Sequence, residues 1–357
     1  MLNGLRVIEI EGLGPAPFAA RHLAQLGADV IVVHRKGGQA SLAKPDELDL
    51  DRGKRSIALD LKDAEDNDIL WGLLKGADVL IEGMRPGVME RLGFGPKEVQ
   101  ASVPHLVYGR MTGWGQTGPR AEQAGHDLNY IALSGALWYA SPAGQIPQTP
   151  PTLVGDIGGG ALYLLVGILA GVFQARQSGV GTVVDAAIVD GAAHMMGLLT
   201  SMGPYLSEER GKSLLDGPHW SRCYACADGR HISVQCLEPK FYQVFLDCLG
   251  LQKDPRFADQ YVTQSWPEQI QHLERLFLTQ PQKHWCDVFE GTDACVAPVL
   301  SPLEAANDPH IKHRNAWAEG RRPNLAPRFS NYMQTHDDPC KRDAHRSEIL
   351  KEIGKET

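Results

Sequence analysis

An imidazole and a carboxyl group stand side by side in residues 125–130, which read Gly-His-Asp-Leu-Asn-Tyr. A further carboxylate, Asp156, follows 30 positions after His126 inside the glycine-rich run 155–160. A histidine and an aspartate that share one pocket can act as a pair of acid and base catalysts. The same residues also fit helix caps, because Asp is favoured immediately before a helix. Taken alone, the two segments favour caps, so the choice depends on the rest of the chain.

The composition is that of a soluble globular protein, with 43% hydrophobic and 22% charged residues among 357. This length predicts one large or two moderate domains. The net charge of −8 argues against nucleic acid as a general partner. Seven cysteines are not typical of a disulfide framework, and Cys223-x-x-Cys226 has no second pair to complete a zinc site. Because no signal peptide is recognisable, we expect a reduced, cytoplasmic protein.

The run 157–173 is apolar and close to membrane-spanning length, but it contains five glycines. We interpret it as a helix buried in a core or in a dimer interface, and we expect no membrane partner.

The first part of the chain alternates strands and helices, which predicts an α/β fold with a parallel sheet. Strands are expected at 5–10, 27–33, 56–60, 78–82 and 106–111, with helices at 19–26 and 64–75. Gly12 and Gly14 begin a dinucleotide fingerprint, but Pro17 stands where its third glycine belongs. The sequence therefore predicts neither NAD nor FAD.

Basic residues flank two of these strands. His34-Arg35-Lys36 ends one strand, and residues 52–55 (Arg-Gly-Lys-Arg) precede another. The first group fits a solvated strand end or a phosphate contact equally well, since open α/β sheets bind ligands at the carboxyl ends of strands. The second group is the kind that receives phosphates.

The second part of the chain has a different pattern. A helix over 128–139, a proline-rich linker over 142–151 and the apolar helix are followed by strands near 223–225 and 231–236. We expect a Rossmann-like large α/β domain over residues 1–200 and a linker over 201–222. A smaller α+β domain follows over 223–310, and 311–357 returns to the large domain and forms the tail.

Several long motifs in a fixed order resemble the class III CoA-transferase superfamily and, within it, the α-methylacyl-CoA racemases. The resemblance runs over nearly the whole chain, and its carriers are residues 4–9, 27–30, 82–93, 110–119, 125–130, 155–160, 184–187, 188–191, 238–242 and 327–330. It implies a large CoA-binding domain and an interlocked homodimer, with each active site between the large domain of one subunit and the small domain of the other.

The resemblance also implies roles for single residues. His126 and Asp156 match bases on opposite faces of the substrate, Glu238 matches a partner of His126 donated across subunits, and Asp127 matches the carboxylate that transferases use as nucleophile. The positions matching residues that contact CoA or line the acyl-CoA site are Arg35, Ala58, Leu59, Asp60, Leu61, Lys62, Gly83, Met84, Arg91, Gly125 and Tyr130.

His126 distinguishes two functions. A transferase needs one nucleophilic carboxylate, whereas a racemase needs two proton carriers at one carbon. We therefore expect a racemase of 2-methylacyl-CoA thioesters that needs no cofactor, with CoA as part of the substrate. A CoA-transferase that uses Asp127 is the alternative, and a non-catalytic acyl-CoA binder is a third. Trp220 and Arg222 depart from the racemase pattern, and we expect them to alter the acyl pocket.

Overall fold

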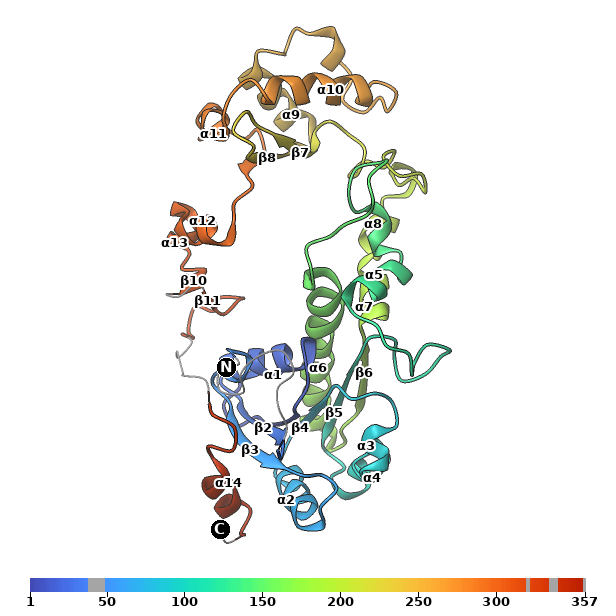
Figure 1. Ribbon diagram of the computed structural model, residues 1–357, viewed down its shortest axis with the longest axis vertical. Coiled ribbons are helices and arrows are strands. Elements are labelled where there is room, and N and C mark those ends of the chain that lie inside the picture. Colours follow the sequence, from blue (N-terminus) through green and yellow to red (C-terminus); the bar gives the residue numbers. More distant parts are fainter. Residues whose placement is uncertain (38–48, 319–321, 334–339, 356–357) are drawn as a thin grey trace. The chain divides into compact units, whose positions relative to one another are not determined.

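The computed structural model describes residues 1–37, 49–318, 322–333 and 340–355 (Figure 1). The chain folds into two compact units. The first contains Met1–Leu137, Pro150–Met196 and Leu325–Thr357, and the second contains Trp138–Thr149 and Gly197–Asn324.

A six-stranded sheet forms the centre of the first unit, in the order β3-β2-β1-β4-β5-β6. All its neighbouring strands run parallel, which confirms the predicted parallel α/β fold. The strands are β1 (Arg6–Ile10), β2 (Asp29–Arg35), β3 (Arg55–Leu59), β4 (Val79–Glu82), β5 (Val107–Thr112) and β6 (Val183–Ala187). The order changes direction between β1 and β4, and such switch points are where open α/β sheets bind ligands.

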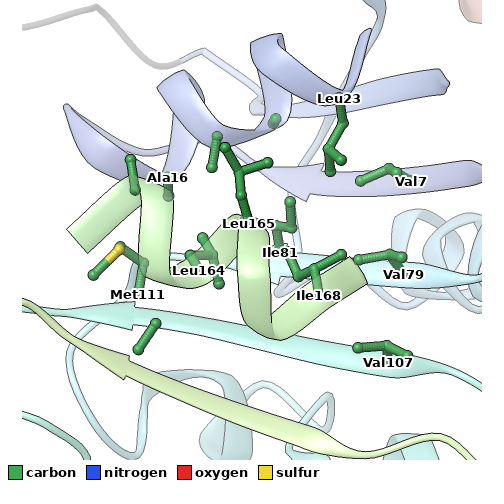
Figure 2. Close-up of a cluster of buried hydrophobic side chains, with 14 of the residues drawn as sticks. Val7, Ala16, Leu23, Val79, Ile81, Val107, Met111, Leu164, Leu165 and Ile168 are labelled. Atoms are coloured by element: carbon green, nitrogen blue, oxygen red, sulfur yellow. The ribbon is translucent and has the colours of Figure 1, made fainter. Parts of the chain in front are cut away.

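Alternate strand residues point to opposite faces of this sheet, and each face has its own hydrophobic core. One face is covered by α1 (Pro15–Gln25) and α6 (Leu162–Ser178). Figure 2 shows this layer, with side chains of α1 and α6 over inward-facing strand residues: Ala16, Leu23, Leu164, Leu165, Ile168, Val7, Val79, Ile81 and Val107. Helix α6 packs so closely on β5 that a Cβ at Gly109 would lie 3.0 Å from Leu164 Cδ1.

The opposite face is covered by α2 (Ala64–Lys75), α3 (Val88–Arg91), α4 (Pro96–Ser102) and α14 (Arg346–Glu352). Helix α2 has the bounds that the sequence predicts. It begins there because the Asp63 side chain accepts hydrogen bonds from the backbone N–H groups of Glu65 and Asp66.

The C-terminal segment completes the exposed edge of β3. Asp343 Oδ1 accepts from the Ala58 N–H (2.7 Å), and His345 Nδ1 accepts from the Ser56 N–H (3.1 Å). Arg346 donates to the Ala58 carbonyl at 2.9 Å. Unpaired backbone groups at a sheet edge invite pairing with other chains, and these side chains satisfy them instead. A short turn, η2 (Asp49–Asp51), precedes β3.

Two predicted helices differ from expectation. The helix predicted over 128–139 is interrupted at Gly135, whose φ of +88° is left-handed. It becomes α5 (Asp127–Leu133) and the 3₁₀ turn η3 (Ala136–Tyr139). The apolar helix predicted over 157–173 begins as a π-helix, η4 (Leu153–Ala161), and continues as α6. After β6 comes α7 (Ile188–Met195).

Residues Leu153–Ser178 form one continuous helix of 26 residues, whose most apolar stretch has a mean hydropathy of 1.8, so the helix is long and apolar enough to cross a membrane. In this fold, 39% of its most apolar stretch is buried within the protein. The expectation of a buried helix therefore holds for the face that packs on the sheet, whereas Val166 and Phe173 are 66% and 68% exposed.

The second unit is built on an antiparallel sheet of β7 (Ser221–Ala225), β8 (His231–Gln235) and β9 (Val296–Pro298). Its other elements are α8 (Gly197–Thr200), η5 (Gly203–Tyr205), α9 (Pro239–Leu249), η6 (Pro255–Phe257), α10 (Trp266–Phe277), α11 (Gln282–Phe289), α12 (Pro302–Asn307), α13 (Pro309–His313), β10 (Trp317–Ala318) and β11 (Arg322–Pro323). Residues 138–149 belong here because Arg210 donates to the carbonyls of Ala140, Ser141 and Gln145.

Trp220 lies in the core of this second unit. Its side chain is 0% exposed, and its indole N–H donates to the Gln260 carbonyl at 3.1 Å. The expectation that Trp220 shapes an acyl pocket is therefore wrong, because a buried core side chain has no surface to offer a ligand.

Candidate active site

Asp127 joins the two segments that the sequence singles out. It is the first residue of α5 and is only 7% exposed. Its Oδ1 accepts hydrogen bonds from the backbone N–H groups of Gly155 and Asp156, each at 2.9 Å, and its Oδ2 accepts from the Thr152 N–H at 3.2 Å. These donors lie at the N-terminus of η4, where backbone N–H groups have no partner within the helix. A negative charge is favourable there.

The predicted helix caps are thus only partly confirmed. His126 is the residue before α5, with extended φ and ψ of −140° and 174°, and its own N–H donates to Asn129 Oδ1 at 3.1 Å. Asp127 binds free N–H groups as predicted, but those of η4 and not those of its own helix. Asp156 lies inside the first turn of η4 and is not a cap.

The glycines around Asp156 allow this close packing. A Cβ at Gly155 would lie 2.4 Å from Asp127 Oδ1, and a Cβ at Gly159 would lie 2.7 Å from the Ala192 backbone nitrogen. On α7, a Cβ at Gly191 would lie 1.9 Å from the Gly159 carbonyl oxygen. The backbones of η4 and α7 are therefore in direct contact. A π-helical turn of this kind is frequent at functional sites.

Asp156 has an altered acidity. Its side chain is half-buried, and burial together with the negative charge of Asp127 raises its pKa, while His126 opposes the rise. The Asp156 carboxyl group therefore interacts electrostatically with both members of the His-Asp pair, His126 and Asp127. Its raised pKa favours the protonated form that an acid catalyst needs.

An aromatic cluster fixes the backbone in front of His126. Tyr130 donates its hydroxyl to the Gly125 carbonyl and packs edge-on against Trp114, with ring centroids 4.7 Å apart. Burial and the charge of Asp156 raise the pKa of Tyr130. A Cβ at Gly113 would lie 1.9 Å from the Tyr130 ring, so the loop after β5 closes onto this ring only because residue 113 is glycine. Trp114 was not among the predicted site residues.

Gly83 and Met84 form the turn after β4, beside the switch point of the sheet. Gly83 is exposed and Met84 half-buried. A Cβ at Gly83 would lie 3.4 Å from Ala16 Cβ and 3.8 Å from the Met111 carbonyl oxygen, so the turn adjoins both α1 and β5. Arg91 ends α3 in the same connection and is exposed.

Among the other predicted CoA contacts, Arg35 is exposed at the end of β2, and Asp60 and Lys62 are exposed after β3. The Asp60 N–H donates to Asp66 Oδ2 at 2.8 Å, and the Lys62 N–H donates to Asp60 Oδ1 at 3.1 Å. Leu59 points into the core and is 1% exposed, so it has only its backbone to offer a ligand. The side chain of Ala58 is half-buried, as is that of Leu61.

The basic run 52–55 does not supply the phosphate ligands that its composition predicts. Lys54 is buried, and its Nζ lies 2.6 Å from Glu9 Oε2 and 3.6 Å from Asp51 Oδ1. Arg55 pairs with Asp29 at 2.6 Å and with carboxylates of α14. Both cations are neutralised within the fold, so the prediction is wrong for these two residues.

Glu238 lies in the second unit, at the N-terminal end of α9. Its side chain is exposed, while its carbonyl accepts from the N–H groups of Phe241 and Tyr242 at 3.0 Å. Glu238 therefore occupies a helix N-terminus, where a carboxylate is favourable.

The cysteines are all free thiols. Cys223 is exposed and Cys226 is buried. Among the residues that the structure describes, no group of three or more His, Cys, Asp or Glu side chains has an arrangement that could hold a metal ion.

Comparisons with known proteins agree over nearly the whole chain. Residues 2–346 match the model of CoA-transferase family III. The alpha-methylacyl-CoA racemase of Homo sapiens is 38% identical over 363 residues, which cover 99% of this chain and 93% of that protein. The acetyl-CoA:oxalate CoA-transferase of Acetobacter aceti is 30% identical over 94% of this chain and 91% of that protein. The crystal structure of a CAIB/BAIF family protein from Brucella suis has the same fold, with a TM-score of 0.82, 23% identity and 98% of each chain covered.

Proposed function

Because the chain belongs to CoA-transferase family III, we propose that it is an α-methylacyl-CoA racemase that interconverts (R)- and (S)-2-methylacyl-CoA by cofactor-independent proton transfer. Identity of 38% to the human racemase supports this choice within the family. So does the histidine beside Asp127, which a transferase does not require.

The hydrogen bonds that the Asp127 carboxylate accepts are the main observation behind this proposal. Its two oxygens accept hydrogen bonds from three backbone N–H groups, those of Gly155, Asp156 and Thr152, at 2.9, 2.9 and 3.2 Å. These three hydrogen bonds and the burial of the side chain make this carboxylate a weaker nucleophile towards a thioester. The Asp156 carboxyl group, by contrast, makes no hydrogen bond to the residues that the structure describes, and the charge of His126 lowers its pKa against the effects of burial and Asp127. His126 and Asp156 are therefore the pair best suited to carry protons.

The proposed reaction begins with the thioester, which acidifies the hydrogen on the neighbouring carbon because the resulting carbanion is an enolate with charge on oxygen. One of His126 and Asp156 takes this proton. Backbone N–H groups near Asp127 and in the preceding glycine-rich loop stabilise the enolate oxygen. The other group then delivers a proton to the opposite face, which inverts the configuration.

Each turnover changes the protonation state of both catalytic groups. After one turnover, the group that took a proton is protonated and its partner has lost one, so both must exchange with solvent before the same direction can run again. Both groups are suited to this exchange, because an imidazole is a common proton carrier in enzymes and burial together with the charge of Asp127 raises the pKa of Asp156. Solvent hydrogen is therefore expected at the α-carbon of the product.

The CoA portion is proposed to lie along the carboxyl edge of the sheet. Arg35, Lys62 and Arg91 are exposed there and carry the charge that phosphates require. The turn of Gly83 and Met84 and the ring of Tyr130 would line the acyl-CoA site.

We also infer a homodimer. Helix α6 exposes Leu162, Val166, Leu169 and Phe173, and their spacing places them in one row along the helix. Exposed apolar patches of this kind mark interaction surfaces. In the dimer proposed here, Glu238 is donated across subunits as the partner of His126.

The alternative function is an acyl-CoA:carboxylate CoA-transferase that uses Asp127 as nucleophile. The 30% identity to the Acetobacter aceti transferase favours it, and the buried Asp127 carboxylate, which already accepts three backbone hydrogen bonds, argues against it.

Incubation of enantiopure (R)-2-methyldecanoyl-CoA, followed by chiral chromatography of the acyl group, separates the two functions. A racemase converts it towards an equal mixture of enantiomers without any carboxylate acceptor. A retained configuration, together with an acyl adduct that hydroxylamine traps on Asp127, would show the transferase instead.

A further inference from the structure

Glu82 is a buried charge at the end of β4. Its side chain is 0% exposed, and it stands in register with Arg110 on β5. Arg110 Nε donates to Glu82 Oε1 at 2.8 Å. A carboxylate enclosed in protein is destabilising unless it is paired, and Arg110 supplies that pairing.

The second oxygen of Glu82 makes a bond that the ion pair does not require. Glu82 Oε2 accepts from the backbone N–H of Met84 at 2.6 Å, so the carboxylate folds back onto the turn that follows its own strand. On its other side the turn meets Ala16 at the start of α1. The turn of Gly83 and Met84 is thus held between a buried carboxylate and a helix, and it cannot shift freely.

Glu90 offers a natural comparison, because it shares Arg110 but not the turn. Arg110 Nη1 donates to Glu90 Oε1 at 2.8 Å, and the Glu90 side chain is 41% exposed. The two carboxylates therefore bind one guanidinium, and only Glu82 connects it to the Met84 backbone.

We propose that Glu82 is a positioning residue that sets the affinity for the acyl-CoA substrate by fixing the backbone of Gly83 and Met84. The inference rests on the proposed function, in which this turn lines the acyl-CoA site. Glu82 touches no reacting atom, so its loss weakens binding and leaves the proton-transfer step in place.

Isobutyryl-CoA is a suitable binding probe, because its α-carbon carries two methyl groups and has no configuration to invert. Calorimetry measures its dissociation constant for the wild type, Glu82→Gln and Glu90→Gln, and kinetics with (R)-2-methyldecanoyl-CoA give kcat and KM. For Glu82→Gln we expect the dissociation constant and KM to rise about tenfold and kcat to change less than about threefold. Glu90→Gln is expected to match the wild type in all three.

Three results would contradict the inference. The first is binding by Glu82→Gln equal to that of Glu90→Gln at an equal melting temperature. The second is a loss in kcat without a change in KM. The third is a wild type that does not bind isobutyryl-CoA, which would also overturn the proposed function, whereas the first two leave it standing. If Glu82→Gln does not fold, Glu82→Asp serves instead, because it keeps the charge for Arg110 and shortens the reach to Met84, and the same tenfold rise is expected.

Discussion

The carboxylate of Asp127 accepts a hydrogen bond from the backbone N–H of Asp156 at 2.9 Å. This bond connects the His-Asp pair at the start of α5 to the first turn of η4, 29 residues later in the sequence. The same carboxylate raises the pKa of Asp156 through its charge, second only to burial. Asp127 therefore controls both where Asp156 lies and how readily it holds a proton.

Replacing Asp127 with Asn tests this double role. The amide keeps one acceptor oxygen but directs N–H donors at backbone N–H groups. We expect unfolding to become easier by about 1–2 kcal/mol and kcat to fall about tenfold or more. Loss of the negative charge lowers the Asp156 pKa, so the limb of the pH–rate profile that reports Asp156 shifts to lower pH. Asp190→Asn, at an exposed position in the first turn of α7, is the control. An unshifted profile in Asp127→Asn would argue against the electrostatic part.

Tyr130→Phe removes only the hydroxyl that holds the Gly125 carbonyl. Because Gly125 precedes His126, we expect kcat to fall about tenfold with little change in KM. Steady-state kinetics check this. Tyr108→Phe removes a comparable hydroxyl-to-carbonyl bond, 2.7 Å to Phe94, from the core of the sheet and should lower stability without lowering kcat. Equal kcat values for the two variants would show that Tyr130 does not position His126.

Asp66 predicts a pH-dependent stability. Burial raises its pKa, but the Asp60 N–H, Lys36 and Arg346 outweigh burial and lower it overall. The folded-state pKa therefore lies below the unfolded value of about 3.9, so the carboxylate stabilises the fold above that pH, and this contribution is lost as the pH falls through the folded pKa. Urea unfolding at pH 7 should show Asp66→Asn less stable than the wild type by about 1–2 kcal/mol.

This difference should shrink at the lowest pH at which both proteins remain folded. Asp68→Asn, at an exposed position on the same helix, should show no such dependence. A stability difference that is constant with pH would mean that charge is not the source of the effect.

The apolar row on α6 predicts the oligomeric state. Phe173 is 68% exposed in the single chain, so Phe173→Glu should convert a dimer into monomers in sedimentation experiments. Gln174→Glu introduces the same charge on the same helix but outside the row, and it should remain dimeric. A wild type that sediments as a monomer, or that remains with the membrane fraction, would contradict the proposed dimer.

The sequence predicts the sheet well and the site only in part. Strands β1, β2, β4 and β5 lie within two residues of their predicted bounds, because strands buried on both faces form continuous apolar runs. The π-helix η4 was not predicted. Its form depends on Asp127 and on the contact between Gly159 and Gly191. Such tertiary contacts cannot be predicted from the local propensity of the sequence.

Side chains that act through the fold were missed for the same reason. Asp343, His345 and Arg346 complete the edge of β3 from the other end of the chain, without any hydrophobic period to reveal them. The pairing of Glu82 with Arg110 requires the register of β4 and β5. Residues that carry chemistry were identified from their types and order, whereas the residues that position them became evident only from the fold.

Proton exchange at the α-carbon tests the central claim most directly. Wild type, His126→Ala and Asp156→Asn are incubated in heavy water with (R)-2-methyldecanoyl-CoA, and deuterium and configuration of the acyl group are followed together by NMR and chiral chromatography. We predict that the wild type incorporates one deuterium with inversion, and that each variant loses inversion by about a hundredfold or more while still binding isobutyryl-CoA. Inversion without deuterium, or undiminished inversion in either variant, would contradict a mechanism in which these two residues exchange protons with one carbon.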